Sequence, residues 1–126
     1  MKKKKILLVD DNPDITRTLG LLLESTGKYK VREENQGVKA FDAAREFRPD
    51  LVFLDIMIPD LEGNEIAAQL EKGEELKHVK IVFLTAIVTK GEVMAGSVTN
   101  ISGHPVLAKP VKSKELIRCI EELLRD

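Results

Sequence analysis

Short apolar runs that each end in a polar side chain constrain the fold of this chain more than any other feature. Each run holds four apolar residues and leads directly into an acid or a hydroxyl: residues 6–9 precede Asp10, residues 51–54 precede Asp55, and residues 81–84 precede Thr85. Apolar runs of this length without polar alternation predict strands that are buried on both faces, which is typical of parallel sheets. The sequence therefore predicts a buried parallel sheet whose strands end in chemically useful side chains.

Apolar residues at helical spacing fill the segments between these strands. Ile15, Leu19 and Leu23 follow Asn12 and Pro13, which supply an N-cap and a first-turn proline. The remaining patterns are weaker strands at residues 31–34 and 106–109 and helices at residues 38–47, around Ile66 and Leu70, at residues 91–98 and at residues 113–124. The predicted order is a strand followed by a helix, five times over.

Strands that alternate with helices predict an α/β fold in which helices cover both faces of a parallel sheet. Right-handed crossovers leave few arrangements for five strands, and the common doubly wound order is 2-1-3-4-5. With 126 residues, the chain is expected to form a single domain over residues 1–126. The expected architecture is a flavodoxin-like (βα)5 doubly wound sandwich with a five-stranded parallel sheet.

Composition restricts the partners and the compartment. The formal net charge is −1, and the basic run at residues 2–5 leads straight into a strand, so it is interpreted as a solvated strand entry. No apolar stretch approaches the roughly 20 residues of a membrane span, and the N-terminus does not resemble a signal peptide. A single cysteine, Cys119, excludes an internal disulfide. We expect a cytoplasmic protein without a nucleic-acid or membrane partner.

Three carboxylates follow strands that are neighbours in the expected sheet. Asp10 and Asp11 follow the first strand and Asp55 follows the third, and ligands of open α/β sheets bind at the carboxyl ends of such strands. Carboxylates that repel one another persist together only if a cation neutralises them or some of their pKa values rise, and oxygen ligands without a nearby His or Cys suit Mg2+. Thr85 adds a hydroxyl and Lys109 adds an ammonium. A nucleophile, a metal site, a hydroxyl and an ammonium together indicate phosphoryl transfer.

Each of these residues has a simpler interpretation when it is taken alone. Asp11 could equally cap a helix, and Asp55 could be a turn residue before Pro59. His78 and His104 are isolated from each other and from the acids, so they are interpreted as structural. The glycine motifs of nucleotide-binding loops are missing from the sequence. The set as a whole, with its members at strand ends in order, favours the chemical interpretation.

Four stretches carry a resemblance to a known family: ILLVDDN at residues 6–12, LDIMIP at 54–59 with Gly63, LTA at 84–86 and KP at 109–110. Together they resemble the receiver domain of bacterial two-component response regulators, over essentially the whole chain. The resemblance implies that Asp55 is the phosphoacceptor and that a sensor histidine kinase or a phosphotransfer protein is the donor. No output domain is expected within these residues.

The resemblance also implies a Mg2+ site, formed by Asp10, Asp11, Asp55 and the backbone carbonyl of Met57. Thr85 and Lys109 would contact the phosphoryl oxygens. Such a phosphoprotein catalyses only its own phosphotransfer and dephosphorylation, so it is a switch in phosphorelay signal transduction rather than an enzyme. It would change conformation to signal to a downstream protein.

Two departures from the family pattern concern how the signal leaves the domain. Val106 occupies the position, three residues before the lysine, where receivers usually carry Tyr or Phe. Valine has no ring to exchange between environments, so we expect the conformational change to lie in the glycine-rich residues 89–103 instead. The bond between Lys109 and Pro110 is expected to be cis, as the resemblance implies.

Two other functions compete with this interpretation. An interaction-only relative of the receiver would keep the fold without being phosphorylated, and the complete set of acids argues against it. A phosphate-ester hydrolase of the haloacid-dehalogenase type would place two aspartates two residues apart after the first strand. Here Asp10 and Asp11 are adjacent and Asn12 follows them, so that motif is missing.

Overall fold

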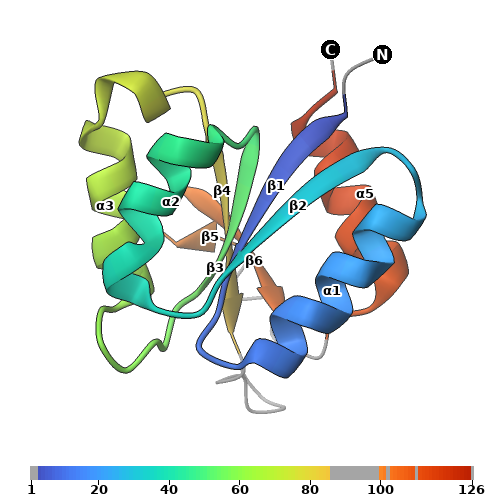
Figure 1. Cartoon of the computed structure of the whole chain (residues 1–126), viewed down its shortest axis with the longest axis horizontal. Helices are drawn as coiled ribbons and strands as arrows, with labels where there is room; N and C mark the ends of the chain where they lie inside the picture. The colour runs from blue at the N-terminus through green and yellow to red at the C-terminus, as the bar shows by residue number, and fades with distance from the viewer. Residues whose placement is uncertain (1–2, 86–99, 102, 110, 126) are drawn as a thin grey trace.

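Helices cover both faces of a central sheet in the computed structural model of the chain (Figure 1). The structure describes residues 3–85, 100–101, 103–109 and 111–125. In chain order the elements are β1 (Lys4–Val9), α1 (Pro13–Ser25), β2 (Tyr29–Glu34), the short 3-10 helix η1 (Gly37–Lys39), α2 (Ala40–Phe47), β3 (Leu51–Asp55), α3 (Gly63–Lys72), the 3-10 helix η2 (Glu74–Leu76), β4 (Lys80–Thr85), β5 (Asn100–Ile101), β6 (His104–Ala108) and α5 (Ser113–Leu123). Helices α2 and α3 lie on one face of the sheet, and α1 and α5 lie on the other.

The described part of the sheet has six strands in the order β2-β1-β3-β4-β6-β5. The first five strands in this order run parallel to their neighbours. With β6 as the fifth predicted strand, this arrangement confirms the predicted 2-1-3-4-5 order and the doubly wound α/β fold. β1 begins two residues before its apolar run, because Lys4 and Lys5 pair with Tyr29 and Lys30 of β2.

Strand β5 is an addition that the sequence pattern does not predict. Its two residues pair antiparallel with β6, so that Asn100 lies opposite Pro105 and Ile101 lies opposite His104. Gly103, which follows β5, has a φ of +83°, a left-handed conformation that glycine adopts without steric cost. A strand of two residues is too short to show any alternation of polar and apolar side chains.

Several expectations fall outside the described residues. The helix expected at residues 91–98 lies there, as does most of the segment 89–103 and Pro110 with its expected cis bond. Val106 is described: it lies in β6 opposite Phe83 of β4, partly buried against the hydrophobic cluster on that face. The side chain at this position therefore packs against the core.

The sheet separates two hydrophobic clusters. Leu7 and Val9 of β1 belong to the cluster beneath α2 and α3, whereas Ile6 and Leu8 belong to the cluster beneath α1 and α5 (Figure 1). Successive residues of a strand point to opposite faces of the sheet. A strand between two clusters must therefore be apolar at every position, which explains the unbroken apolar runs.

The first strand begins and the last helix ends at the same end of the sheet. β1 begins and α5 ends at this end (Figure 1), and Lys4, Ile120 and Leu124 line one hollow there. The carboxyl ends of β1 and β3 lie at the opposite end of the sheet, because the two strands are parallel. The start of β1 and the end of α5 thus lie at the end of the sheet opposite to the predicted site.

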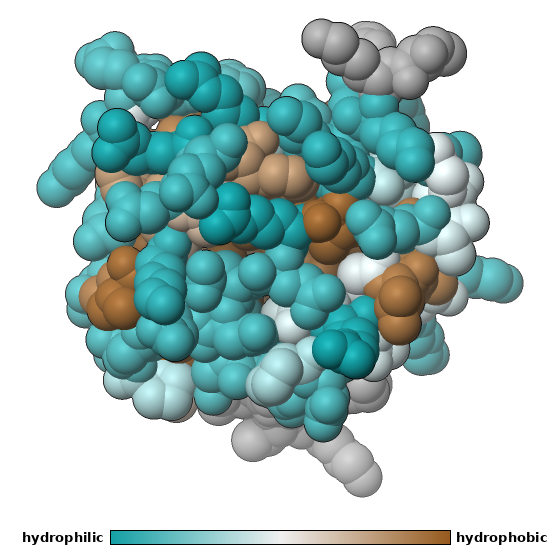
Figure 2. Space-filling model, in the orientation of Figure 1, coloured by the Kyte–Doolittle hydropathy of each residue, from teal (hydrophilic) through white to brown (hydrophobic). Residues whose placement is uncertain are grey.

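The surface is mostly hydrophilic on the face seen in Figure 2, with separate hydrophobic patches. Three large hydrophobic side chains are exposed among the described residues: Leu21, Val38 and Met57. None of the helices within the described ranges has the length and apolar character needed to cross a membrane.

Candidate functional site

Three aspartates lie together at the carboxyl ends of β1 and β3. Asp10 and Asp11 directly follow β1, Asp55 is the last residue of β3, and Val9 pairs with Leu54 in the ladder between the two strands. One carboxylate oxygen of each aspartate lies within 4.8 Å of one oxygen of each of the others. Asp10 and Asp55 are 1% and 5% exposed, whereas Asp11 is exposed. This acid cluster therefore combines two buried carboxylates with one at the surface.

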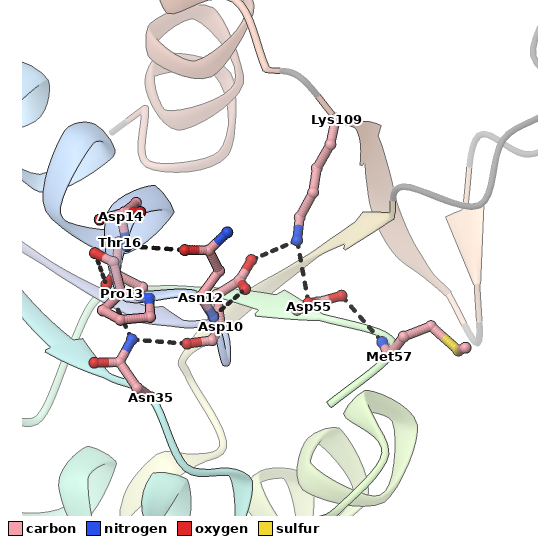
Figure 3. A network of polar contacts seen from close by, with 9 residues as sticks. All are labelled: Asp10, Asn12, Pro13, Asp14, Thr16, Asn35, Asp55, Met57 and Lys109. Atoms are coloured by element: carbon pink, nitrogen blue, oxygen red, sulfur yellow. Dashed lines mark hydrogen bonds and ion pairs between the residues drawn. The ribbon is translucent and has the colours of Figure 1, made fainter. Parts of the chain in front are cut away.

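The Lys109 ammonium lies between the two buried carboxylates (Figure 3). Its Nζ is 2.5 Å from Asp10 Oδ2 and 3.1 Å from Asp55 Oδ2. The backbone N–H of Lys109 donates to the carbonyl of Thr85 at 2.8 Å, which fixes the base of this side chain at the end of β4. Burial lowers the pKa of Lys109, but the contacts with Asp10 and Asp55 outweigh burial, so the pKa is raised and the ammonium stays charged.

Both oxygens of the Asp55 carboxylate accept hydrogen bonds. Oδ1 accepts from the backbone N–H of Met57 at 3.0 Å, and Oδ2 accepts from Lys109 Nζ. Burial nevertheless raises the pKa of Asp55; the hydrogen bonds from Met57 and Lys109 oppose this effect, and the charge of Asp10 adds to it. One ammonium thus does not fully offset two buried carboxylates, and further positive charge would be favourable here.

Asp10 keeps one buried oxygen that is incompletely satisfied. Its Oδ1 accepts from the backbone N–H of Asn12 at 3.0 Å. Its Oδ2 lies beside Lys109 Nζ but accepts no aligned hydrogen bond from the described residues. A buried polar atom of this kind is costly unless another ligand reaches it. Since the acid cluster offers only oxygen donors, the residues present fit a hard divalent cation such as Mg2+.

A side chain that follows β2 anchors the loop carrying Asp10 and Asp11. The Nδ2 of Asn35 donates to the backbone carbonyl of Asp10 at 2.8 Å and to Thr16 Oγ1 at 3.0 Å (Figure 3). In the same loop, the side chain of Asn12 accepts from the N–H at position 14 and forms the predicted N-cap of α1. Asn35 was not predicted as a site residue, because a polar residue after an edge strand indicates only a loop.

Glycine is required where α3 begins beside the end of β3. The N–H of Gly63 donates to the carbonyl of Ile56 at 3.0 Å. A Cβ at position 63 would lie 2.6 Å from the carbonyl oxygen of Asp55 and 2.9 Å from Ile56 Cα. Movement of a flexible side chain would not relieve contacts with these backbone atoms. Gly63 therefore allows α3 to start in direct contact with the strand end that carries Asp55.

The remaining predicted residues also lie at the carboxyl ends of the strands. Thr85 is the buried last residue of β4, and it pairs with Ala108, directly before the lysine. Met57 approaches Asp55 through its backbone N–H, while its side chain is exposed. The structure thus brings together all the predicted positions: Asp10, Asp11, Asp55, Met57, Thr85 and Lys109. The use of the Met57 carbonyl as a metal ligand stays a prediction.

Comparison with protein families finds a match to the response regulator receiver domain over residues 6–121. Among curated proteins, the polar-differentiation response regulator DivK of Brucella anthropi is 31% identical to this chain over 123 residues. That alignment covers 98% of this chain and 98% of the relative. The similarity therefore extends over the whole described sheet and its helices.

Solved structures with the same architecture include a receiver domain that holds magnesium. The receiver domain of the sensor histidine kinase PA1611 from Pseudomonas aeruginosa, with a magnesium ion coordinated in its active-site cleft, matches with a TM-score of 0.81 at 29% identity. This match covers 99% of this chain and 100% of that chain. The chemotaxis protein CheY4 of Vibrio cholerae has a TM-score of 0.82 at 24% identity, with 98% and 100% covered, and shows the shared fold alone.

Proposed function

The chain belongs to the response regulator receiver domain family, and from this premise we propose that Asp55 accepts a phosphoryl group in a Mg2+-dependent reaction. Receiver domains are signalling switches of two-component systems rather than classical enzymes. In the proposal, a sensor histidine kinase or a phosphotransfer protein is the donor. The phosphorylated domain then signals to a downstream protein in the cytoplasm, without itself binding nucleic acid.

The surroundings of the Asp55 carboxylate are the observation that carries this proposal. The carboxylate is buried beside two other acids, and hydrogen bonds from Met57 and Lys109 hold its two oxygens. A structural acid at a strand end would not need two further carboxylates within 4.8 Å, since their mutual repulsion destabilises the fold. An oriented nucleophile beside a metal site is what phosphoryl transfer requires.

In the proposed step, a carboxylate oxygen of Asp55 attacks the phosphorus of a phosphohistidine. A P–O bond forms while the P–N bond breaks, and the leaving imidazole takes the electron pair of the broken bond. The N–H of Met57 and the ammonium of Lys109 restrict the rotation of the carboxylate before the donor arrives. This orientation lowers the entropic cost of reaching the transition state.

A Mg2+ ion would be held by the acid cluster and the backbone carbonyl of Met57. When bound, it would neutralise the charge of the acids and of the phosphoryl oxygens. The buried, incompletely satisfied Oδ2 of Asp10 supports this assignment. The receiver domain of PA1611, with its magnesium ion in the active-site cleft, supports it as well.

Lys109 and Thr85 would change partners once the phosphoryl group is present. Lys109 contacts both Asp10 and Asp55, so its ammonium is already within reach of a group bound to either carboxylate. Thr85 ends the strand next to β3 and brings its hydroxyl to the same edge. In the proposal both side chains donate to phosphoryl oxygens, and this exchange of contacts begins the conformational change.

Phosphorylation by a small phosphodonor tests the proposal directly. Incubation with phosphoramidate and Mg2+ should add the mass of one phosphoryl group to the parent protein, and Asp55→Asn should abolish the addition. Asp14→Asn is the matched control, because Asp14 is an exposed acid at the start of α1 that receives the same chemical change. Intact-protein mass spectrometry reads both variants.

Two results would overturn the assignment. One is a phosphorylated product of the Asp55→Asn protein with the same stoichiometry as the parent. The other is a parent protein that stays unmodified at saturating donor and Mg2+, which would instead indicate an interaction-only domain.

A further inference from the structure

Asn35 connects three parts of the molecule through one side-chain amide. The residue follows the edge strand β2, while its two acceptors belong to the residue after β1 and to the first turn of α1 (Figure 3). Both N–H groups of the amide are used, one for the carbonyl of Asp10 and one for Thr16 Oγ1. Thr16 is 1% exposed, and its hydroxyl in turn donates to the carbonyl of Pro13 at 3.2 Å.

These bonds hold both ends of the loop at residues 10–13, which carries Asp10 and Asp11 and leads into the first residue of α1. Asn35 holds the first residue of the loop, and Thr16 holds the last one through its bond to Pro13. The bonds from Asn35 span 25 and 19 residues of sequence, so the loop is also held by a side chain outside it. Asp10 is also held by its own N–H, which donates to the carbonyl of Glu34 at 3.1 Å, and by the ion pair with Lys109, so the bonds from Asn35 add to these contacts at the loop itself.

The carboxylates on this loop have an electrostatic reason to move away from Asp55. Like charges within 4.8 Å repel one another, and two of the three carboxylates are buried. Loop movement that separated them would lower this repulsion in the metal-free protein, but it would also destroy the arrangement that a cation needs. A preorganised site avoids that cost when the cation binds.

We propose that Asn35 is a positioning residue for the Mg2+ site: by binding the Asp10 carbonyl and Thr16 together, it holds Asp10 and Asp11 beside Asp55. This inference rests on the proposed function. Asn35 acts through the backbone of the ligand loop, in the way that hydrogen-bond partners behind metal ligands set the ligands' orientation. Its loss is expected to weaken Mg2+ binding more than it weakens the fold.

Calorimetric titration of the metal-free protein with Mg2+ tests this role. Asn35→Ala should raise the Mg2+ dissociation constant about tenfold, the lower end of the range for groups that support metal ligands. Thr26→Ala is the matched control. Thr26 is also half-buried and makes two hydrogen bonds, to the carbonyl of Leu23 and from the N–H of Lys28, at the opposite end of α1. It should lower the melting temperature while leaving the Mg2+ dissociation constant unchanged.

A second variant keeps the test valid if Asn35→Ala does not fold. Thr16→Val keeps the shape of a buried side chain but removes one acceptor of Asn35. It should raise the dissociation constant about threefold, in line with the loss of one modest hydrogen bond. In the double variant the effects should be less than additive, because both substitutions break the same connection.

The outcomes separate this inference from the proposed function. If the parent binds Mg2+ and the Asn35 and Thr16 variants bind it equally well, Asn35 is only a structural residue and the inference is wrong. Equal weakening in the Thr26 control would also overturn it, because the effect would then follow from lost stability. If the parent itself binds no Mg2+, the proposed metal site fails and this inference fails with it.

Discussion

Lys109 is the countercharge of two buried carboxylates, Asp10 and Asp55. Its side chain is 13% exposed, and the side chains of Asp10 and Asp55 are 2% and 7% exposed. Water therefore screens these contacts poorly, so the charges of the three groups interact strongly. The same lysine that is proposed to bind the phosphoryl group also has a role in stability before any phosphoryl group arrives.

Lys109→Met should strongly destabilise the metal-free protein. Removing one member of a buried ion pair leaves uncompensated charge, which typically costs about 3 kcal/mol or more. Here two carboxylates would lose their shared partner while a methionine fills the space of the alkyl chain. Urea unfolding in a chelating buffer at neutral pH measures the change in the free energy of unfolding.

An exposed lysine provides the control for this substitution. Lys28 lies 4.0 Å from Glu121, and both side chains are more than half exposed. Lys28→Met should change the free energy of unfolding by only about 0.5 kcal/mol or less, as exposed ion pairs usually do. Similar losses in the two variants would show that the charge of Lys109 has no special part in stability.

At the scale of the elements, the strands next to the site were the most predictable feature. An apolar run followed by a polar side chain marked β1, β3 and β4, because each is buried on both faces and ends at the same edge. Parallel pairing then required the polar ends to meet. The position of the acid cluster therefore follows from the order of the strands and from the pattern within each one.

Features that depend on backbone pairing or on single long-range bonds were not predictable. β5 has two residues and exists through its pairing with β6, for which the sequence carries no pattern. No sequence pattern marks Asn35 either, because the acceptors of its two hydrogen bonds lie 25 and 19 residues away in the sequence. Local propensity describes what a segment prefers by itself, and neither feature is local.

The start of α3 leads to a prediction for that element. Gly63→Ala should destabilise the protein by about 1–3 kcal/mol, because the added Cβ would press on the backbone of β3 at Asp55 and Ile56. The displacement would also disturb Asp55, the proposed phosphoacceptor, so the rate of phosphorylation by phosphoramidate should fall. Thermal unfolding and intact-protein mass spectrometry measure the two effects.

Gly73, at the other end of α3, is the control. Its φ is −73°, and a Cβ there would meet its neighbours at 3.4 Å or more. Gly73→Ala should therefore be neutral or stabilising by roughly 0.5 kcal/mol, through a smaller entropy of the unfolded chain. A Gly63→Ala protein as stable as this control would mean that β3 and α3 can separate without cost.

At the scale of the whole molecule, the site and the fold have opposing requirements. The two hydrophobic clusters on either side of the sheet stabilise the domain. The acid cluster works against them, because it holds three carboxylates together with one ammonium. A cation that binds this cluster should consequently stabilise the entire fold, since it binds the native state and not the unfolded chain.

Mg2+ should raise the melting temperature of the protein, and the rise should continue with the logarithm of the Mg2+ concentration once this exceeds the dissociation constant. At a concentration about 100 times its dissociation constant, the gain is roughly 2.7 kcal/mol in the free energy of unfolding. Asp11→Ala should reduce this gain by weakening binding. In chelating buffer the same variant should be at least as stable as the parent, because one repelling charge is gone. Differential scanning calorimetry with and without Mg2+ tests both statements.

The opposite result in chelating buffer would be informative. If Asp11→Ala were clearly less stable than the parent without any divalent cation, the carboxylate of Asp11 would be a structural group. A Mg2+-dependent stabilisation that is identical in the parent and the variant would exclude Asp11 as a ligand.

The location of the chain ends has a practical consequence for experiments. β1 starts and α5 stops at the end of the sheet that is remote from the acid cluster (Figure 1). A tether attached at either end would hold the domain on a biosensor chip with its aspartates directed toward the flowing solution. Immobilised in this way, the protein would leave its acid cluster accessible to the proposed phosphodonor, and the anchoring chemistry would not compete with the proposed phosphotransfer.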